Sequence, residues 1–347
     1  MKFIHMADMH LGALPDAGKP WADTRARELW DTFSDICEAC NRERADLLLI
    51  AGNLFDRQPL NKELKEAAYI LGKLNRTQVV IMAGDCDYLR PNDNYSTYPW
   101  PDHVHFFKNE SIDKLYFNFL DTEIWGLSYM HSTITGSLYD ELSPEINDTY
   151  HILLAHGGDE EHIPINRIQL ATAGFDYVAL GHSMQPRLYE REKCACCGSP
   201  EPLTPYDGES HGYILGEITG EGTRIRFIPI AKRSYKRVEI TVSGKSSTAG
   251  VLDELREKLS EYGMGNIYTV VLKGNGFDNV DKEALLSAGN ILEVCEDARP
   301  VYDYDRLYRE HKGDIIGRFL EISDKYQDEC GVKARDYGLF ALLGGNK

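Results

Sequence analysis

The stretch Leu47-Leu48-Leu49-Ile50-Ala51-Gly52-Asn53 decides the fold, because five consecutive apolar residues stop at a glycine and a polar side chain. Apolar runs of four to six residues bounded by glycine are typical of strands buried on both faces. The same pattern occurs at four more places: Phe3 to Ala7 before Asp8 and His10, Val79 to Ala83 before Asp85, Ile152 to Ala155 before His156, and Tyr177 to Leu180 before His182. Metal-binding residue types at five equivalent strand ends indicate one site.

Amphipathic helices are expected between the first three strands. Apolar residues keep a 3.6-residue period from Leu29 to Cys40 and again from Leu64 to Leu74. Cys37 and Cys40 belong to the first of these faces, where they serve as small buried residues. Strands alternating with helices predict an α/β core, in which ligands gather beyond the carboxyl ends of the strands.

Length and composition narrow the classes of protein. A chain of 347 residues predicts about two domains. The net charge of −17 argues against a surface that coats nucleic acid non-specifically, although a local basic patch remains compatible with it. No apolar run approaches the roughly 18 residues of a membrane span, and no signal-peptide pattern precedes Asp8, so we expect a cytoplasmic protein.

A second, smaller domain is expected in the C-terminal part. A hairpin from Gly212 to Ile228 precedes a β-α-β-α-β pattern that begins with the strand from Tyr235 to Val242 and ends near Val294. The chain from Tyr302 onward is expected to be helical.

The chemistry of the strand ends points to a metal. Asp8 and His10, two residues apart, can hold one cation together. With His156 and His182 on neighbouring strand ends, carboxylate and neutral imidazole suit Mn, Fe or Zn. Metal-activated water is a common means of hydrolysing phosphoesters.

The five polar segments resemble the five motifs of calcineurin-like metallophosphoesterases, and within that family they are most similar to the SbcD-type DNA double-strand-break repair nucleases. The segments are Asp8-Met9-His10, Gly52-Asn53-Leu54-Phe55-Asp56, Gly84-Asp85-Cys86-Asp87, His156-Gly157 and Gly181-His182-Ser183-Met184. The similarity to the SbcD subgroup lies in residues 175–182 and in Gly198-Ser199-Pro200-Glu201-Pro202-Leu203.

This resemblance implies a fold and partners. It implies an α/β, two-sheet metallophosphoesterase sandwich flanked by helices over residues 1–235, a small α/β capping domain over 236–300 and a C-terminal helical segment over 301–347. The implied partners are DNA, an SMC-like SbcC-type ATPase and a second copy of the chain.

Several positions depart from the family pattern. Asn53 replaces a metal-bridging Asp, Asp85 and Cys86 replace an Asn and a catalytic His, and Met184 replaces the second His of the fifth motif. Carried over position by position, the first metal would be held by Asp8, His10, Asn53 and Met184, and the second by Asn53, Asp85, His156 and His182. The first set loses a carboxylate and an imidazole, so we expect one ion, most simply Mn, rather than two.

The catalytic positions implied by the resemblance are Cys86, Asp56 and His10. A thiol carries no positive charge and cannot act as an imidazolium. Three hypotheses therefore stay open: a nuclease with an impaired one-metal site, a catalytically inactive DNA-binding or ATPase-scaffolding protein, and a redox or metal sensor that uses Cys86.

Two further clusters have both a functional and a structural interpretation. Lys232, Arg233, Lys236 and Arg237 form a basic run that could follow a phosphate backbone or face solvent. Cys194, Cys196 and Cys197 could bind zinc or act in redox chemistry, although zinc fingers need recurring pairs of cysteines; the resemblance implies that this stretch is a strand.

Overall fold

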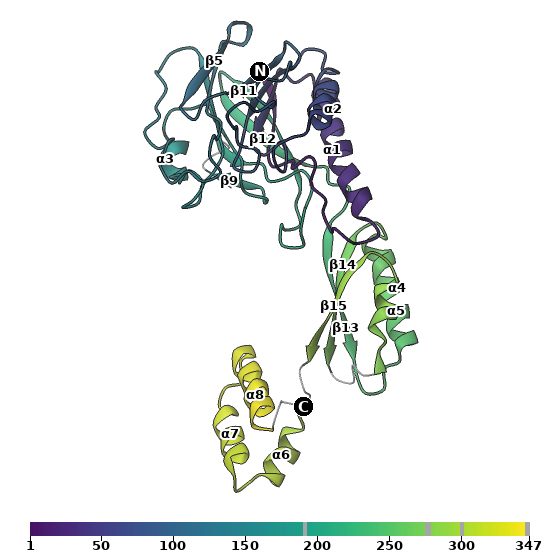
Figure 1. The fold of residues 1–347 in the computed structure, drawn as a ribbon. Helices are drawn as coiled ribbons and strands as arrows, with labels where there is room; N and C mark the ends of the chain where they lie inside the picture. The colour runs from purple at the N-terminus through teal and green to yellow at the C-terminus, as the bar shows by residue number, and fades with distance from the viewer. Residues whose placement is uncertain (190–192, 275–278, 299–301, 344–347) are drawn as a thin grey trace. The chain divides into compact units, whose positions relative to one another are not determined.

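The computed structural model describes residues 1–189, 193–274, 279–298 and 302–343, and it divides into two units, Met1–Tyr235 and Lys236–Lys347 (Figure 1). None of the helices in these ranges is long and apolar enough to cross a membrane.

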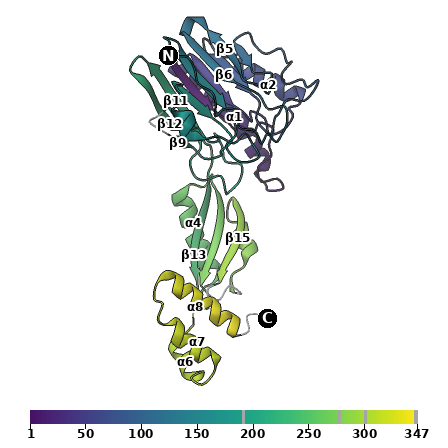
Figure 2. The ribbon, with the colours of Figure 1, turned by 90° about the vertical axis from the view of Figure 1, so that its left-hand side faces the viewer.

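The first sheet of the N-terminal unit has the strand order β12-β11-β1-β2-β3-β4. Strands β1 to β4 are parallel, while β11 pairs antiparallel with both β1 and β12 (Figure 2). The bounds are β1 Lys2–Met6, β2 Leu47–Ala51, β3 Gln78–Met82, β4 Val104–Phe106, β11 Gly212–Thr219 and β12 Gly222–Pro229.

The second sheet has the order β5-β6-β7-β8-β10-β9. Its four central strands are parallel, and the edge strands β5 and β9 are antiparallel to their neighbours. The bounds are β5 Asp113–Phe117, β6 Thr122–Gly126, β7 Tyr150–Ala155, β8 Tyr177–Leu180, β9 Arg187–Tyr189 and β10 Cys194–Cys196.

Strand β2 shows why the apolar runs are continuous. Its residues Leu47, Leu49 and Ala51 belong to the core between the two sheets. Leu48 and Ile50 belong to the core beneath the helices α1 (Ala22–Glu43) and α2 (Asn61–Leu71), which lie side by side in Figure 1. Both faces of the strand are covered, so an alternation of polar and apolar residues would leave polar groups buried. The short elements α3 (Arg167–Ala171) and η1 (Asn118–Leu120) complete this unit.

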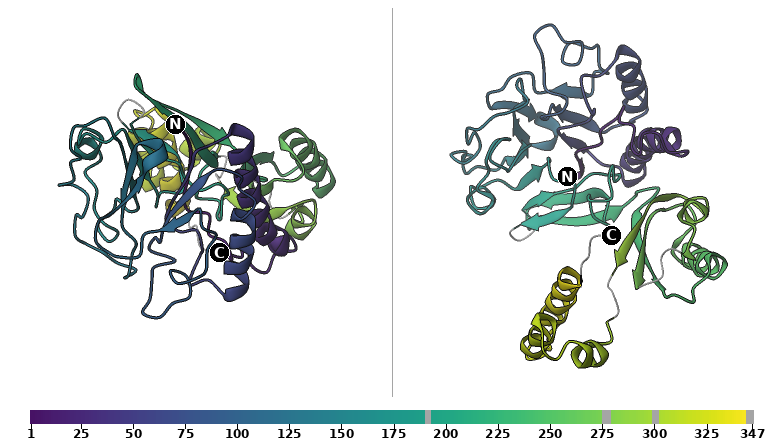
Figure 3. Two further views of the ribbon diagram at one scale, coloured as in Figure 1. Left: turned by 90° about the horizontal axis from the view of Figure 1, so that it is seen from above. Right: turned by 60° about the horizontal axis from the view of Figure 1, so that its bottom comes forward.

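The C-terminal unit contains a three-stranded sheet with two helices packed on it, followed by a group of three helices. The sheet has the order β13-β14-β15, and α4 and α5 lie on the same face of it (Figure 3). The bounds are β13 Tyr235–Val242, α4 Thr248–Tyr262, β14 Ile267–Gly274, α5 Lys282–Leu286, β15 Ile291–Ala298, α6 Tyr304–Glu310, α7 Ile315–Ser323 and α8 Glu329–Leu342.

The expected fold class is confirmed: the chain has two large sheets in an α/β arrangement flanked by helices. The strands β4, β5, β6 and β9 were not anticipated, because they are short or partly exposed and carry no continuous apolar run.

Candidate metal centre

Four of the expected ligand positions lie on left-handed backbone where the strands end. The φ angles are 52° at Asp8, 49° at His10, 52° at Asn53 and 81° at His182. Such values are uncommon outside glycine and gather at functional sites, because the surrounding structure must hold them in place. Main-chain hydrogen bonds from Asp8 to Gly52 and from His10 to Asn53 join the first two loops.

Asp85, His156 and His182 converge most closely. The Oδ1 atom of Asp85 lies 2.8 Å from Nε2 of His156 and 3.2 Å from Nδ1 of His182. Their potential ligand atoms all lie within 4.8 Å of one another. The three side chains come from the ends of β3, β7 and β8, so the centre joins both sheets.

The hydrogen bonds around these imidazoles test whether a cation fits. Nδ1 of His156 donates to the main-chain oxygen of Ala51 at 2.7 Å, because a carbonyl oxygen can only accept. A neutral His156 then presents a bare Nε2 to the carboxylate of Asp85, so two acceptor atoms face each other. A proton or a metal ion between them relieves this repulsion. Two imidazoles and one carboxylate are a donor set that suits Mn, Fe or Zn, so these residues fit a divalent cation.

The pKa values of the centre show strong mutual stabilisation. Burial by itself would raise the pKa of Asp85, but the hydrogen bonds with His156 and His182 outweigh it and lower that pKa. Burial likewise opposes the charged form of His182, while Asp85 and Asp159 raise its pKa to about 9. The site therefore has a strong preference for positive charge next to Asp85.

Asn53 acts as a neutral cross-link between carboxylates. Its Nδ2 donates to Asp8 at 3.0 Å and to Asp85 at 3.1 Å, and its Oδ1 accepts from the main-chain N–H of Cys86 at 3.0 Å. A ligand role for Asn53 needs the amide oxygen, which faces the main chain in this arrangement. A Cβ on Gly84 would lie 2.3 Å from that oxygen, so glycine is required there.

The residues expected at the first metal are engaged with other groups. Oδ2 of Asp8 accepts from the main-chain N–H of His182 at 2.8 Å. Nδ1 of His10 pairs with Asp56 at 3.1 Å, whereas its Nε2 is 3.9 Å from Asp8. Burial opposes a charge on His10, but Asp56 and Asp8 raise its pKa. Met184 follows in the loop after β8, and its main-chain oxygen accepts from Ser199.

Cys86 is half-buried beside the centre. Its Sγ lies 3.6 Å from Oδ2 of Asp85, and burial together with the carboxylates of Asp85 and Asp87 raises the pKa of the thiol. Cys86 is therefore a neutral thiol at pH 7. Asp87 is fully buried and accepts from the main-chain N–H groups of Phe55 and Gly84, so it holds the second and third loops together.

The loop after β7 contributes residues that the sequence analysis missed. Asp159 accepts from Nε2 of His182 at 2.7 Å, and His162 lies over the His182 ring with 4.6 Å between centroids. With His182 they form the second of two three-donor groups among the described residues. An Asp and a His within six residues of His156 are the signal that could have identified them.

The basic run is divided between the two units. Lys232 pairs with Asp35, and Nε of Arg233 lies 2.7 Å from Glu28, both within the first unit. In the second unit Lys236 lies over the ring of Tyr262 and Arg237 pairs with Glu239. Each cation has a partner, so binding of a phosphate backbone by this run would compete with these contacts.

The subgroup segment around Glu201 has a structural role. Glu201 and Arg25 are both fully buried as side chains and lie 3.2 Å apart. Glu201 also accepts from Thr32 at 2.7 Å and from the main chain of Lys232 at 2.7 Å, which ties α1 to the end of the first unit.

The thiols of Cys194, Cys196 and Cys197 are buried on and next to β10. Neither of the three-donor groups found among the described residues contains a cysteine. A structural role is the simplest interpretation of these thiols.

Comparison with known proteins identifies related chains. The profile of the family "Calcineurin-like phosphoesterase" matches residues 1–186. The uncharacterized metallophosphoesterase YhaO of Bacillus subtilis (strain 168) is 24% identical over 304 residues, which cover 79% of this chain and 72% of the relative. The DNA double-strand break repair protein Mre11 of Sulfurisphaera tokodaii is 26% identical over 335 residues, or 89% of this chain and 81% of the relative. The Mre11 protein of Sulfolobus acidocaldarius is 24% identical over 343 residues, or 91% and 83%.

Proposed function

Because the chain belongs to the calcineurin-like phosphoesterase family, we propose that it is a metal-dependent phosphodiesterase that acts on DNA, an SbcD-like repair nuclease subunit with an impaired one-metal site. The observation that carries this proposal is the convergence of Asp85, His156 and His182 on one point. The names of the Mre11 relatives, which align over most of the chain, support DNA as the substrate.

The protein's own groups prepare this site for hydrolysis. A divalent cation held by Asp85, His156 and His182 would polarise a phosphate oxygen and lower the pKa of bound water. His156 is held by Ala51, which directs Nε2 at the centre. Asn53 fixes Asp8 and Asp85 at a set separation, and Asp56 holds the ring of His10. These contacts limit the motion of the side chains that they join.

The impairment follows from the groups that the site lacks. Cys86 provides no positive charge, and burial together with Asp85 raises the pKa of its thiol in the metal-free site. Losing an acid or an electrostatic stabiliser at such a position typically reduces the rate by about 10²–10⁴-fold. Asn53 provides neutral donors where a bridging carboxylate would attract a second cation. We therefore expect one ion per chain, with Mn as the first candidate and Fe or Zn as alternatives.

The presence of Cys86 where the family pattern has a catalytic histidine also favours a second candidate function, a catalytically inactive DNA-binding or ATPase-scaffolding protein on the same fold. The test compares metal content by mass spectrometry and Mn-dependent cleavage of a labelled duplex in two proteins. One is the wild type. The other restores the family pattern by the changes Asn53→Asp, Asp85→Asn, Cys86→His and Met184→His.

An impaired nuclease should bind one ion and cleave slowly, and the restored variant should cleave at least about 10²-fold faster. A wild type that binds DNA without any metal-dependent cleavage, beside a restored variant that cleaves, would support the inactive alternative. Wild-type cleavage that the restored variant does not exceed would refute the impaired site.

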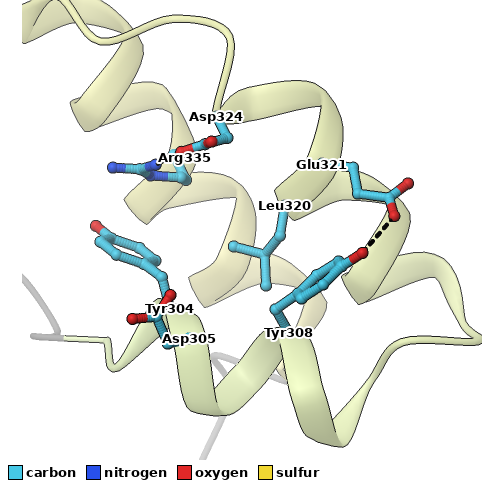
Figure 4. A pocket seen from close by; sticks show the side chains of 7 residues that line it. All are labelled: Tyr304, Asp305, Tyr308, Leu320, Glu321, Asp324 and Arg335. Atoms are coloured by element: carbon cyan, nitrogen blue, oxygen red, sulfur yellow. Dashed lines mark hydrogen bonds and ion pairs between the residues drawn. The ribbon is translucent and has the colours of Figure 1, made fainter.

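The C-terminal helices are the proposed contact for an SMC-like ATPase. Ile315, Ile322, Tyr337 and Phe340 on α7 and α8 are exposed. A pocket of about 340 Å³ lies among α6, α7 and α8. Figure 4 shows its lining, in which Arg335 lies over the Tyr304 ring and Tyr308 donates to Glu321. A cytoplasmic location, a cap formed by residues 236–300 and a homodimer belong to the same proposal.

A further inference from the structure

The side chain of Asp159 accepts hydrogen bonds from four donors although it is half-exposed. It accepts from Nε2 of His182 at 2.7 Å and from Nδ1 of His162 at 2.9 Å. The main-chain N–H groups of Glu161 and His162 add two further bonds of 2.9 Å. Three of the four donors come from the loop itself, as in an Asx turn, and they fix one oxygen of the carboxylate while the other oxygen contacts His182.

The backbone of the loop is held as firmly as the carboxylate. Ile163 is buried and has a φ of 37°, which is strained for a β-branched residue. Its N–H donates to Ile134 at 2.7 Å, and that of Ile134 donates to Glu161 at 2.8 Å. A Cβ on Gly157 would lie 2.2 Å from the oxygen of His162, so the turn closes only with glycine there. These contacts maintain the strained turn that directs Asp159 toward the centre.

Both nitrogens of His182 face carboxylates, Nε2 at 2.7 Å from Asp159 and Nδ1 at 3.2 Å from Asp85, and the shorter contact favours Nε2 as the protonated nitrogen of a neutral ring. A neutral imidazole carries one N–H and one lone pair. When Nε2–H donates to Asp159, the lone pair is on Nδ1, the atom that faces Asp85 at 3.2 Å. A separate cation on Asp159, His162 and Nε2 would need the lone pair that Asp159 directs to the other side of the ring. The two donor groups that share His182 therefore compete for the single lone pair of its neutral ring.

We propose that Asp159 is a positioning residue of the metal centre, which holds His182 in the tautomer and orientation that present Nδ1 to the cation, and that His162 holds Asp159 in place. This proposal rests on the proposed function, because it assumes that Asp85, His156 and His182 bind a divalent ion. A carboxylate behind a ligating histidine typically contributes about 10–100-fold in metal affinity.

The experiment titrates Co²⁺ into the metal-free full chain and follows its visible absorption, which reports affinity, stoichiometry and ligand geometry together. Asp159→Asn removes the charged acceptor with little change in shape. Glu160→Gln is the matched control, since it removes the same charge from the exposed neighbouring residue. His162→Gln removes the ring donor to Asp159, together with the Nε2 atom that lies 3.8 Å from Asp85, and keeps Asp159.

We expect one Co²⁺ per chain in each protein, a dissociation constant about 10–100-fold higher in D159N with an altered spectrum, a smaller rise in H162Q and no change in E160Q. Equal affinities of D159N and E160Q would overturn the proposal. Two ions in the wild type and one in D159N, with the remaining affinity unchanged, would also overturn it, because Asp159 would then be a ligand. DNA cleavage is measured separately: a wild type that binds Co²⁺ but cleaves nothing with any metal refutes only the proposed function.

Discussion

Replacing Asn53 by aspartate should destabilise the metal-free protein and make its stability dependent on metal and pH. The amide of Asn53 donates to Asp8 at 3.0 Å and to Asp85 at 3.1 Å. An ionised carboxylate at position 53 would place a third negative charge at those distances with no proton to share. The Asn53→Asp variant therefore either repels both carboxylates or binds a proton, and the protonated acid can donate to only one of them.

Protonation of the new aspartate sets an upper limit to the stability that the Asn53→Asp variant loses. Keeping an aspartic acid protonated at pH 7, when its ordinary pKa is about 3.9, costs about 4 kcal/mol, and at pH 5 the cost is about 1.5 kcal/mol. The folded variant binds more protons than its unfolded chain between these pH values, so its stability falls as pH rises. For a unit of this size, about 4 kcal/mol corresponds to a fall of roughly 8–16 °C in the unfolding temperature.

Calorimetric unfolding in chelator at pH 5 and pH 7, with and without Mn²⁺, measures this effect. Saturating Mn²⁺ should restore more stability to the variant than to the wild type, because a cation replaces the missing donor. Asn92→Asp, which adds the same charge at an exposed position, is the control. An Asn53→Asp variant that is as stable as the wild type in chelator at pH 7 would refute the cross-link.

Three further predictions concern the surroundings of the centre. Arg25→Met leaves the buried Glu201 without its cation and should lower the free energy of unfolding by about 3–5 kcal/mol. Arg224→Met breaks an exposed ion pair and should lower it by less than about 1 kcal/mol. Urea unfolding of the two variants measures the difference. If the basic run follows a phosphate backbone, replacing Lys232, Arg233 and Lys236 together by alanine should reduce the slope of log K against log salt for duplex binding by up to about three. An unchanged slope would assign these residues to their ion pairs. Burial lowers the pKa of His5 to about 3, so below pH 6.5 the unfolded chain binds a proton that the folded chain does not, and stability falls with acid. Between pH 8 and pH 5 the free energy of unfolding should fall by about 2 kcal/mol more in the wild type than in His5→Gln. Parallel profiles of stability against pH in the two proteins would contradict this.

Some features of the site could be predicted from residue order because they depend on local pattern. The run Leu47 to Ala51 can only be a strand with both faces covered, and its end must lie at the edge where parallel neighbours also end. The meeting of Asp85, His156 and His182 follows from that rule and from their positions directly after strands. The unusual residues at 53, 86 and 184 are equally visible in the sequence, since the resemblance supplies the pattern from which they depart.

The direction in which each polar side chain points could not be predicted from residue order. Asn53 was expected to offer its oxygen, but its orientation depends on two acceptors and one donor that lie 32 to 45 residues away along the chain. In the sequence, Lys232 and Arg233 are part of a basic run. Only the fold shows that α1 places Asp35 and Glu28 beside them.

The sequence by itself determined the α/β fold, the strand ends at which the site forms and the residue types available there, because burial and periodicity act over a few neighbouring residues. Only the tertiary structure decided that Asn53 joins two carboxylates, that Asp159 and His162 belong to the centre, and that each imidazole presents one particular nitrogen to Asp85. The physical reason is that a hydrogen bond has a direction, and that direction is determined by acceptors which folding brings together from distant parts of the chain.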